Sequence, residues 1–191
     1  MRYKEYNVNK VLNQTISLFW QQGFNGSSIN EIVKKTGVNR FSLYREFESK
    51  EGVLYNSLRL YRQRYCNEKL LILESTGDLK KILNNFYLAF LKESQPVQGC
   101  YIIHIGTELA DRDLRVKKIV DEYLSDIENL LFKLLSKNGY KNEDAKFRVR
   151  HLLGLYCTAM SFCLIHSETQ RKSYISNGIN LILSDDVKSS K

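Results

Sequence analysis

Residues 28–50 read SINEIVKKTGVNRFSLYREFESK, and this stretch decides the fold. It opens on a capping box, Ser28 followed by Glu31, in which a hydroxyl and a carboxylate satisfy free amides at the start of a helix. Gly37 then allows a sharp turn, and Asn39 is suited to cap a second short helix. That second helix carries Arg, Ser, Tyr and Arg on its outward side. The pattern predicts a helix-turn-helix whose second helix enters the DNA major groove.

Helices are also predicted on both sides of this stretch. Apolar residues recur at helical spacing before it, and Gly23 is suited to end that helix. After it, a helix begins at Ser49 and extends as far as about Glu74. The predicted helices are 9–22, 28–36, 39–47, 49–74, 78–92, 100–110, about 113–137, 143–166 and 170–183.

No segment has the alternation of a strand, so we predict an all-α chain of about nine helices. The predicted division is a helix-turn-helix DNA-binding domain at 1–50, a second helical domain at 51–184 and a polar tail at 185–191.

The net charge of +8 is concentrated near the motif. Residues 1–65 contain 11 Lys and Arg against 5 Asp and Glu, whereas residues 66–191 contain 18 against 16. A basic lobe attracts phosphate without needing sequence information. The coincidence of charge and motif therefore favours double-stranded DNA as a partner.

Other features disfavour competing classes of protein. The cysteines Cys66, Cys100, Cys157 and Cys163 form no CxxC pair and are expected to be reduced. The most apolar run, 152–166, is too short to span a bilayer, and the N-terminus lacks the apolar core of a signal peptide. We therefore expect a cytoplasmic protein with no membrane partner. No Gly-rich phosphate loop, nucleophile elbow or HExxH motif is present, and we do not expect an enzyme.

Side chains suited to DNA gather on the second helix of the motif and around it. A reading helix needs donors near its N-terminus and phosphate contacts at its flanks. Arg40 can form paired hydrogen bonds to a guanine, Phe41 can pack on a thymine methyl, and Ser42 can donate or accept. Tyr44 and Lys50 suit phosphates. The predicted DNA-binding residues are Ser27, Ser28, Asn39, Arg40, Phe41, Ser42, Tyr44, Arg45 and Lys50.

These motifs resemble the N-terminal domain of the TetR family of bacterial transcriptional regulators. The resemblance rests on Gly23-Phe24, Ser28-Ile29-Asn30-Glu31-Ile32, Lys35-Thr36-Gly37-Val38, Ser42-Leu43-Tyr44 with Phe47, and Ser49-Lys50-Glu51 with Leu54. Phe41 departs from the family, which commonly has a small residue there. Its ring either alters which bases are read or packs inward against the first helix.

The resemblance also implies roles for the later helices. In this family the last two long helices pair with their two-fold mates, which assigns a homodimer interface to 143–166 and 170–183. An effector cavity would lie among the helices between, and aromatic side chains there suit a small lipophilic or aromatic effector. Taken singly, each such residue is more often ordinary core. The predicted effector-binding residues are Tyr61, Tyr65, Phe86, Phe90, Tyr101, His104, Glu108, Tyr123, Tyr156 and Phe162.

A metal site is the alternative for one of these groups. Cys100, His104 and Glu108 share one helix face, as ligands of a metal sensor would. The outer two lie about 12 Å apart along a straight helix, which is too far for one ion without ligands from elsewhere. We therefore predict no metal and no cofactor.

Taken together, the sequence predicts a TetR-like dimeric transcriptional regulator. We expect a repressor that binds a palindromic DNA operator and is released by a small-molecule effector. The alternative is a dimeric DNA-binding protein with no small-molecule effector, and the sequence does not separate the two.

Overall fold

The computed structural model describes residues 6–92, 99–161 and 165–184, and every regular element within these ranges is helical. The predicted all-α fold is thus confirmed. Phe162 and the tail at 185–191 lie outside the described residues. The helices are α1 (Val8–Gln22), α2 (Ile29–Thr36), α3 (Arg40–Phe47), α4 (Lys50–Tyr61), α5 (Asn67–Leu70), α6 (Leu79–Lys92), α7 (Tyr101–Leu109), α8 (Leu114–Lys137), α9 (Asn142–Ser161) and α10 (Glu168–Ile182).

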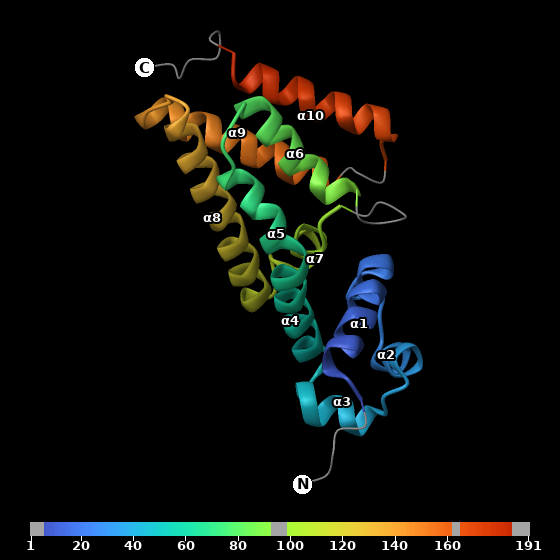
Figure 1. Ribbon diagram of the computed structural model, residues 1–191. Helices are drawn as coiled ribbons and strands as arrows, with labels where there is room; N and C mark the ends of the chain where they lie inside the picture. Colours follow the sequence, from blue (N-terminus) through green and yellow to red (C-terminus); the bar gives the residue numbers. More distant parts are fainter. Residues whose placement is uncertain (1–5, 93–98, 162–164, 185–191) are drawn as a thin grey trace.

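The molecule is elongated, with the first three helices gathered in a lobe at one end (Figure 1). Helix α4 packs on α1 and leads away from this lobe into the rest of the chain. At the far end α9 packs between α8 and α10, and α10 also contacts α6. Helix α7 contacts α1, α4, α8 and α9, so it lies where the lobe meets the larger helical body.

Short-range signals fix the helix-turn-helix as predicted. The Ser28 hydroxyl accepts from the Glu31 amide at 3.2 Å, and the Glu31 carboxylate accepts from the Ser28 amide at 2.7 Å. Gly37 ends α2 in the left-handed conformation, with φ of 72°. The Asn39 side chain caps α3 by accepting from the Ser42 amide at 2.8 Å. These caps satisfy amides that lack a partner inside the helix, so both helices begin where the sequence indicates.

The lobe is held together by one fully buried side chain from each of its helices and from α4. These are Phe19, Ile32, Leu43 and Leu54. Burying a side chain of this size contributes about 1.5–3 kcal/mol. Because Leu43 faces this core, the opposite side of α3 is left for solvent or a partner.

The chain stays helical from Lys50 to Glu74, as predicted, but not as a uniform α-helix. Residues Arg62–Cys66 form a π turn, and Leu71–Glu74 form a 3₁₀ turn at the end. A π turn widens the helix by one residue and shifts the faces on either side of it. Cys66, the last residue of this π turn, is fully buried.

Two helix ends near the C-terminus differ from the prediction. Helix α9 is described as far as Ser161, and residues 165 and 166, which the prediction placed in this helix, are not helical. Helix α10 begins at Glu168, two residues earlier than predicted, because Ser167 and Gln170 form a second capping box. The prediction lacked this capping box and therefore placed the start of the helix at Gln170.

Candidate nucleic-acid interface and effector core

The outward face of α3 carries most of the predicted DNA contacts. Arg40, Tyr44 and Arg45 are exposed, and Ser42 is half-buried. Phe41 is 74% exposed, which decides between the two alternatives for this residue: its ring points outward and does not pack against α1. An aromatic ring this exposed contributes little to folding, so it is available to a partner.

Hydrogen bonds preorganise the start of α3. Arg40 Nη2 donates to the Asn30 side-chain oxygen on α2 at 2.6 Å. Asn39, exposed and also predicted to contact DNA, uses its side-chain oxygen to cap α3. A guanidinium has five N–H donors, so Arg40 keeps donors for a base edge while Asn30 restrains its direction.

The two predicted serines act mainly on their own backbone. Ser27 is buried, and its hydroxyl donates to the Gly23 carbonyl oxygen at 2.7 Å. Ser28 is exposed but uses its hydroxyl as the α2 cap. Their hydroxyls therefore shape the turn before α2. The group that remains available to a phosphate is chiefly the exposed N-terminus of α2.

Lys50, predicted to bind a phosphate, has partners within the chain. Its Nζ donates to the Ser27 carbonyl oxygen at 2.5 Å and lies 4.0 Å from the centre of the Phe24 ring. Burial lowers the pKa of Lys50, and the nearby carboxylates of Glu51 and Glu108 oppose that effect. The ammonium thus ties the start of α4 to the turn before α2.

The predicted effector-binding aromatics form two clusters in the larger body. In the first, Tyr61 and Tyr101 lie 5.4 Å apart between ring centres, and Trp20 of α1 packs against both at 5.3 and 5.7 Å. Tyr65 packs on Tyr61 from outside and is 38% exposed. The Tyr101 hydroxyl lies 2.9 Å from the Ser57 hydroxyl of α4. This cluster joins the lobe to the body. Helical periodicity marks Trp20 and Ser57 only as core, so their part in this cluster was not predicted.

The second cluster lies deeper. Tyr156 packs against Phe86 and Phe90, each at 5.4 Å between ring centres. Its hydroxyl lies 2.7 Å from that of Tyr123 on α8. All four side chains are buried. The rings contact one another directly, so a ligand entering here would have to displace or separate them.

Two thiols adjoin this second cluster. Cys100 is buried at the N-terminal end of α7, and the Tyr123 hydroxyl lies 3.8 Å from its sulfur. Burial opposes ionisation of Cys100, but hydrogen bonds from Cys66, the Ile103 amide and the hydroxyls of Tyr156 and Tyr123 lower its pKa to about 6. Burial raises the pKa of Cys66. The sequence offered no signal for this, since no Lys or Arg flanks Cys100.

The remaining two predicted effector residues lie toward the lobe. His104 is half-buried, and burial lowers its pKa while the charge of Glu108 opposes that effect. Glu108 directs its carboxylate to the backbone that follows α1. Cys100 and Glu108 therefore engage different surroundings at opposite ends of α7. Within the described ranges, no group of three His, Cys, Asp or Glu side chains is placed to hold a metal ion.

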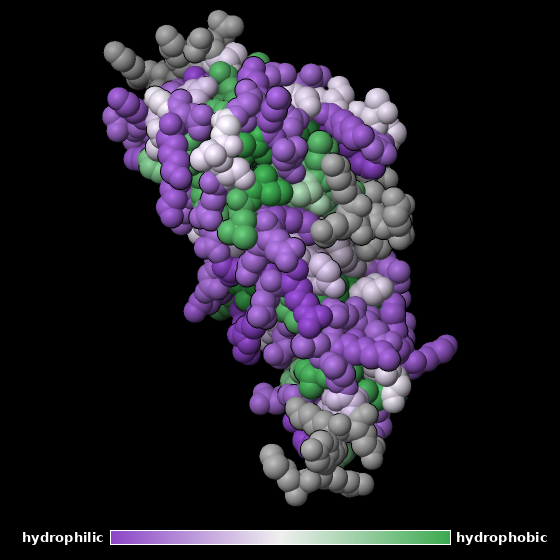
Figure 2. Space-filling model, in the orientation of Figure 1, coloured by the Kyte–Doolittle hydropathy of each residue, from purple (hydrophilic) through white to green (hydrophobic). Residues whose placement is uncertain are grey.

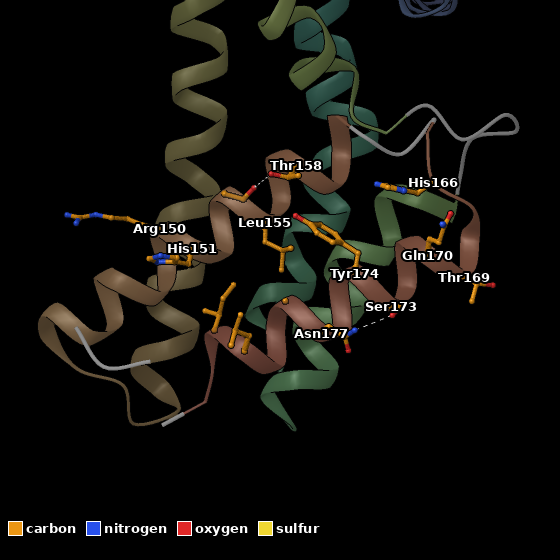
Figure 3. A pocket seen from close by; sticks show the side chains of 14 residues that line it. Arg150, His151, Leu155, Thr158, His166, Thr169, Gln170, Ser173, Tyr174 and Asn177 are labelled. Atoms are coloured by element: carbon orange, nitrogen blue, oxygen red, sulfur yellow. Dashed lines mark hydrogen bonds between the residues drawn. The ribbon is translucent and has the colours of Figure 1, made fainter. Parts of the chain in front are cut away.

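A groove of about 1110 Å³ runs along the surface between α9 and α10, away from both clusters. Figure 3 shows Leu155 of α9 and Tyr174 of α10 in the middle of this groove. Leu181, also in its wall, is 66% exposed. The face of the molecule visible in Figure 2 is mostly hydrophilic, with its largest hydrophobic areas in the upper half that holds α6, α8, α9 and α10. None of the helices in the described part of the chain is both long and apolar enough to cross a membrane.

Comparison with known proteins agrees with this geometry. Residues 11–55, which span most of α1 through the first half of α4, match the family model of bacterial regulatory proteins of the tetR family. The chain is 22% identical over 134 residues to the HTH-type transcriptional regulator YezE of Bacillus subtilis, covering 69% of each protein. It is 30% identical over 115 residues to the HTH-type transcriptional repressor ComR of Escherichia coli, covering 57% of this chain and 54% of ComR.

Solved structures share the fold over nearly the whole chain. A cysteine mutant of the TetR family transcriptional regulator CifR, in complex with double-stranded operator DNA, superposes with a TM-score of 0.82 at 13% identity. That match covers 94% of this chain and 98% of CifR. The reduced form of NemR from E. coli superposes with a TM-score of 0.76 at 19% identity, covering 93% of this chain and 96% of NemR.

Proposed function

The chain belongs to the TetR family of bacterial transcriptional regulators, and we propose that it is a homodimeric repressor that binds an operator in DNA and leaves it when a small molecule binds. The outward face of α3 carries this proposal. Arg40, Phe41 and Tyr44 are exposed there together, on a helix whose other side is anchored by the buried Leu43. A rigid helix presenting base-reading and phosphate-binding groups is what major-groove recognition requires.

The groove between α9 and α10 supports the proposal that the protein is a homodimer. Tyr174 and Leu181 are exposed on α10 and both line this groove, and an exposed apolar patch of this kind marks an interaction site. A Cβ atom added to Gly154 of α9 would have no neighbouring atom within 4 Å, so the backbone there lies open to another helix. A two-fold copy of the same pair would cover both helices and would place two reading helices about one helical turn of DNA apart.

The aromatic clusters support a small apolar effector. We propose that it binds among the inner side chains and so alters the contacts of Trp20 with the body. Coupling of this kind requires the effector to favour one position of the lobe over the other. The proposed effector contacts are Tyr61, Tyr101, Phe86, Phe90, Tyr123 and Tyr156.

One observation favours the alternative without an effector. Phe86 and Tyr156 stack at 5.4 Å between ring centres, and Phe90 packs on the same ring, so this part of the core is filled by its own side chains. A regulator of this design would respond only to its own concentration or to a partner protein.

A selection from a random duplex library at moderate salt tests the DNA part of the proposal. We expect enrichment of a palindrome bound by one dimer. Replacing both Arg40 and Phe41 with Ala should abolish the enrichment, whereas the control Lys117→Ala, at an exposed site on α8, should leave it unchanged. Absence of any enriched sequence with the wild-type protein would refute the proposal.

A screen of metabolites and drug-like compounds then separates the two candidate functions. We expect at least one compound to raise the melting temperature and also to release the enriched operator. Binding of a ligand to the folded state stabilises it by mass action, so the two effects should share one concentration dependence. If compounds stabilise the protein but none releases the operator, the regulator without an effector is favoured.

A further inference from the structure

The carboxylate of Glu108 joins the two parts of the molecule. Glu108 belongs to the last turn of α7, in the larger body. Its Oε2 accepts from the Phe24 amide at 2.8 Å, and its Oε1 accepts from the Asn25 amide at 2.7 Å. These amides follow the C-terminus of α1, 84 and 83 residues earlier in the chain. Both oxygens of one carboxylate are thus used on the helix-turn-helix lobe.

The backbone of the lobe is shaped to receive this carboxylate. Gly23 has φ of +76°, a conformation that side chains with a Cβ rarely adopt. A Cβ atom added there would also lie 3.1 Å from Glu108 Oε2 and 3.2 Å from Oε1. Gly23 therefore serves two purposes: it ends α1, and it leaves room for the carboxylate to approach the two amides.

The segment that Glu108 holds is the one that positions the DNA-binding residues. Phe24 lies under the Lys50 ammonium, which in turn donates to the Ser27 carbonyl oxygen. Ser28 follows directly and begins α2, whose Asn30 accepts from Arg40. A displacement of the Phe24–Asn25 backbone would thus be passed on to the reading helix through α2 and α4.

The other side of the connection is fixed in the body, because α7 packs on α8 and α9. The packing of α7 on α8 is close, because a Cβ atom added to Gly106 would lie 3.0 Å from a Val120 methyl. Glu108 is therefore held on a helix that moves with the body.

We propose that Glu108 is a positioning residue for operator binding. It does not contact DNA; it fixes the orientation of the helix-turn-helix lobe relative to the dimerising body. In a dimer this orientation sets the half-site separation that the protein accepts. The inference rests on the proposed homodimeric operator binding, and it adds the residue that makes the dimer selective for one operator spacing.

The chemistry of the contact makes it sensitive to a conservative change. Hydrogen bonds from backbone amides to an ionised carboxylate are about twice as strong as neutral ones. In Glu108→Gln one amide keeps an acceptor, but the other faces the new NH₂ group, which cannot accept. Glu108→Ala removes both acceptors. Loss of one charged hydrogen bond corresponds to about a tenfold change in an equilibrium constant or more.

Operators with altered spacing provide the test. The operator enriched by the wild-type protein is compared with versions carrying one base pair more or one fewer between half-sites, which rotates one half-site by about 34°. We expect the wild-type protein to lose about tenfold or more in affinity for the altered operators. For Glu108→Ala, the ratio of the affinity for the enriched operator to that for the altered operators should fall to about twofold or less. Glu108→Gln should give a ratio between those of Glu108→Ala and the wild type. A variant that merely folds less well would lose affinity for all three operators equally.

The control for charge is Asp111→Asn. Asp111 is exposed near the same helix end, and its carboxylate pairs with the neighbouring Arg112 at 3.2 Å. Asp111→Asn removes one negative charge, as the Glu108 variants do, and so changes the long-range attraction to DNA in the same way. Because it keeps the Glu108 contact, its ratio of affinities for the enriched and altered operators should equal that of the wild type. Hydrogen exchange gives a second measurement without DNA: the Phe24 and Asn25 amides should exchange about tenfold faster in Glu108→Ala.

The outcomes separate the inference from the proposed function. If the wild type prefers no operator or shows no spacing preference, homodimeric operator binding itself is wrong. If the wild type discriminates and Glu108→Ala discriminates equally, the inference alone is overturned. Unchanged exchange of the Phe24 and Asn25 amides in a folded Glu108→Gln protein would also overturn it.

Discussion

The hydroxyl of Tyr55 on α4 donates to Oδ2 of Asp113, the residue that caps α8, at 2.8 Å. The other oxygen of Asp113 accepts from the amides of Arg115 and Val116 at 2.9 and 3.0 Å. The Arg115 guanidinium lies 4.5 Å from the centre of the Tyr55 ring. One carboxylate thus begins α8 and also holds α4, the helix that leads out of the DNA-binding lobe.

Tyr55→Phe should lower the free energy of unfolding by about 1 kcal/mol, because it removes one hydrogen bond to a charged acceptor without creating a large cavity. Burial, together with the hydrogen bond and charge of Asp113, raises the pKa of Tyr55 to about 12, against an ordinary value of 10.0. A raised folded-state pKa contributes stability that is complete below pH 10 and is lost as the pH rises toward 12. The difference between wild type and Tyr55→Phe should therefore shrink over that window.

Urea unfolding at a series of pH values measures this difference. The matched control is Tyr44→Phe, at an exposed position on α3. That variant should unfold at the same urea concentration as the wild type at every pH. A difference between wild type and Tyr55→Phe that grows between pH 10 and 12 would contradict the proposed cause of the pKa shift.

Phe41→Ala should weaken operator binding while leaving folding almost unchanged. The ring is 74% exposed, so its removal should alter the free energy of unfolding by about 0.5 kcal/mol or less. If the ring packs on a thymine methyl, affinity should fall for the operator but not for random duplex DNA. Fluorescence anisotropy with both DNAs measures the two losses. Equal losses on both would show that Phe41 does not contribute to specificity.

Arg40→Ala should relax the base preference at one operator position by about 1–3 kcal/mol, as expected for a paired contact to guanine. Asn30→Ala should have a smaller effect in the same direction, because Asn30 only restrains the guanidinium through a 2.6 Å hydrogen bond. Binding to a panel of single-base operator variants measures the preference. Should Asn30→Ala change the preference more than Arg40→Ala, Asn30 rather than Arg40 would be the base-reading residue.

Much of the DNA-binding lobe was predictable because its signals are local. Ser28 with Glu31, Gly37 and Asn39 each act on amides within three or four residues, so the sequence alone places α2, the turn and α3. The outward position of Phe41 was not predictable. It depends on which face of α3 the buried Leu43 and Phe47 leave free, and the sequence allowed the ring to pack inward.

The contacts of Lys50 and Glu108 within the chain could not be predicted for a related reason. The sequence indicates a phosphate as the partner of Lys50, and the family resemblance implies an effector as the partner of Glu108. In the structure their partners are backbone groups 23 residues away for Lys50, and 84 and 83 residues away for Glu108. Backbone partners leave no trace in the pattern of side chains, so only the fold reveals them.

Cys100→Ala should lower stability more at high pH than at low pH. The pKa of Cys100 in the folded protein is lowered to about 6, against an ordinary value of 9.0. A lowered folded-state pKa contributes stability that is complete above pH 9 and is lost as the pH falls toward 6. The difference in unfolding free energy between wild type and variant should therefore increase from pH 6 to pH 9.

Cys157→Ala is the control, with a reductant present throughout. Burial raises the pKa of Cys157, so its contribution should stay constant up to pH 9 and decline only above it. Parallel pH profiles for the two variants would argue against an ionised Cys100 in the folded protein.

Two glycines in α9 and α10 distinguish packing within the chain from packing between chains. A Cβ added to Gly178 would lie 2.9 Å from both terminal methyls of Leu155, whereas one added to Gly154 meets nothing within 4 Å. Gly154→Gln should therefore leave the folded monomer intact, and the better helix propensity of Gln should raise its stability by about 0.5 kcal/mol. If α9 packs against a second copy, the same change should raise the dimer dissociation constant about ten- to a hundredfold.

Gly178→Ala is the counterpart. It should lower the free energy of unfolding by about 0–2 kcal/mol, because the shift of the Leu155 methyls or of α10 costs about 1–3 kcal/mol and the better helix propensity of Ala offsets about 1 kcal/mol of that. Sedimentation equilibrium and urea unfolding of both variants separate the two effects. A Gly154→Gln protein with an unchanged dimer dissociation constant would exclude this part of α9 from the interface, and the two-fold partner would then have to pack elsewhere.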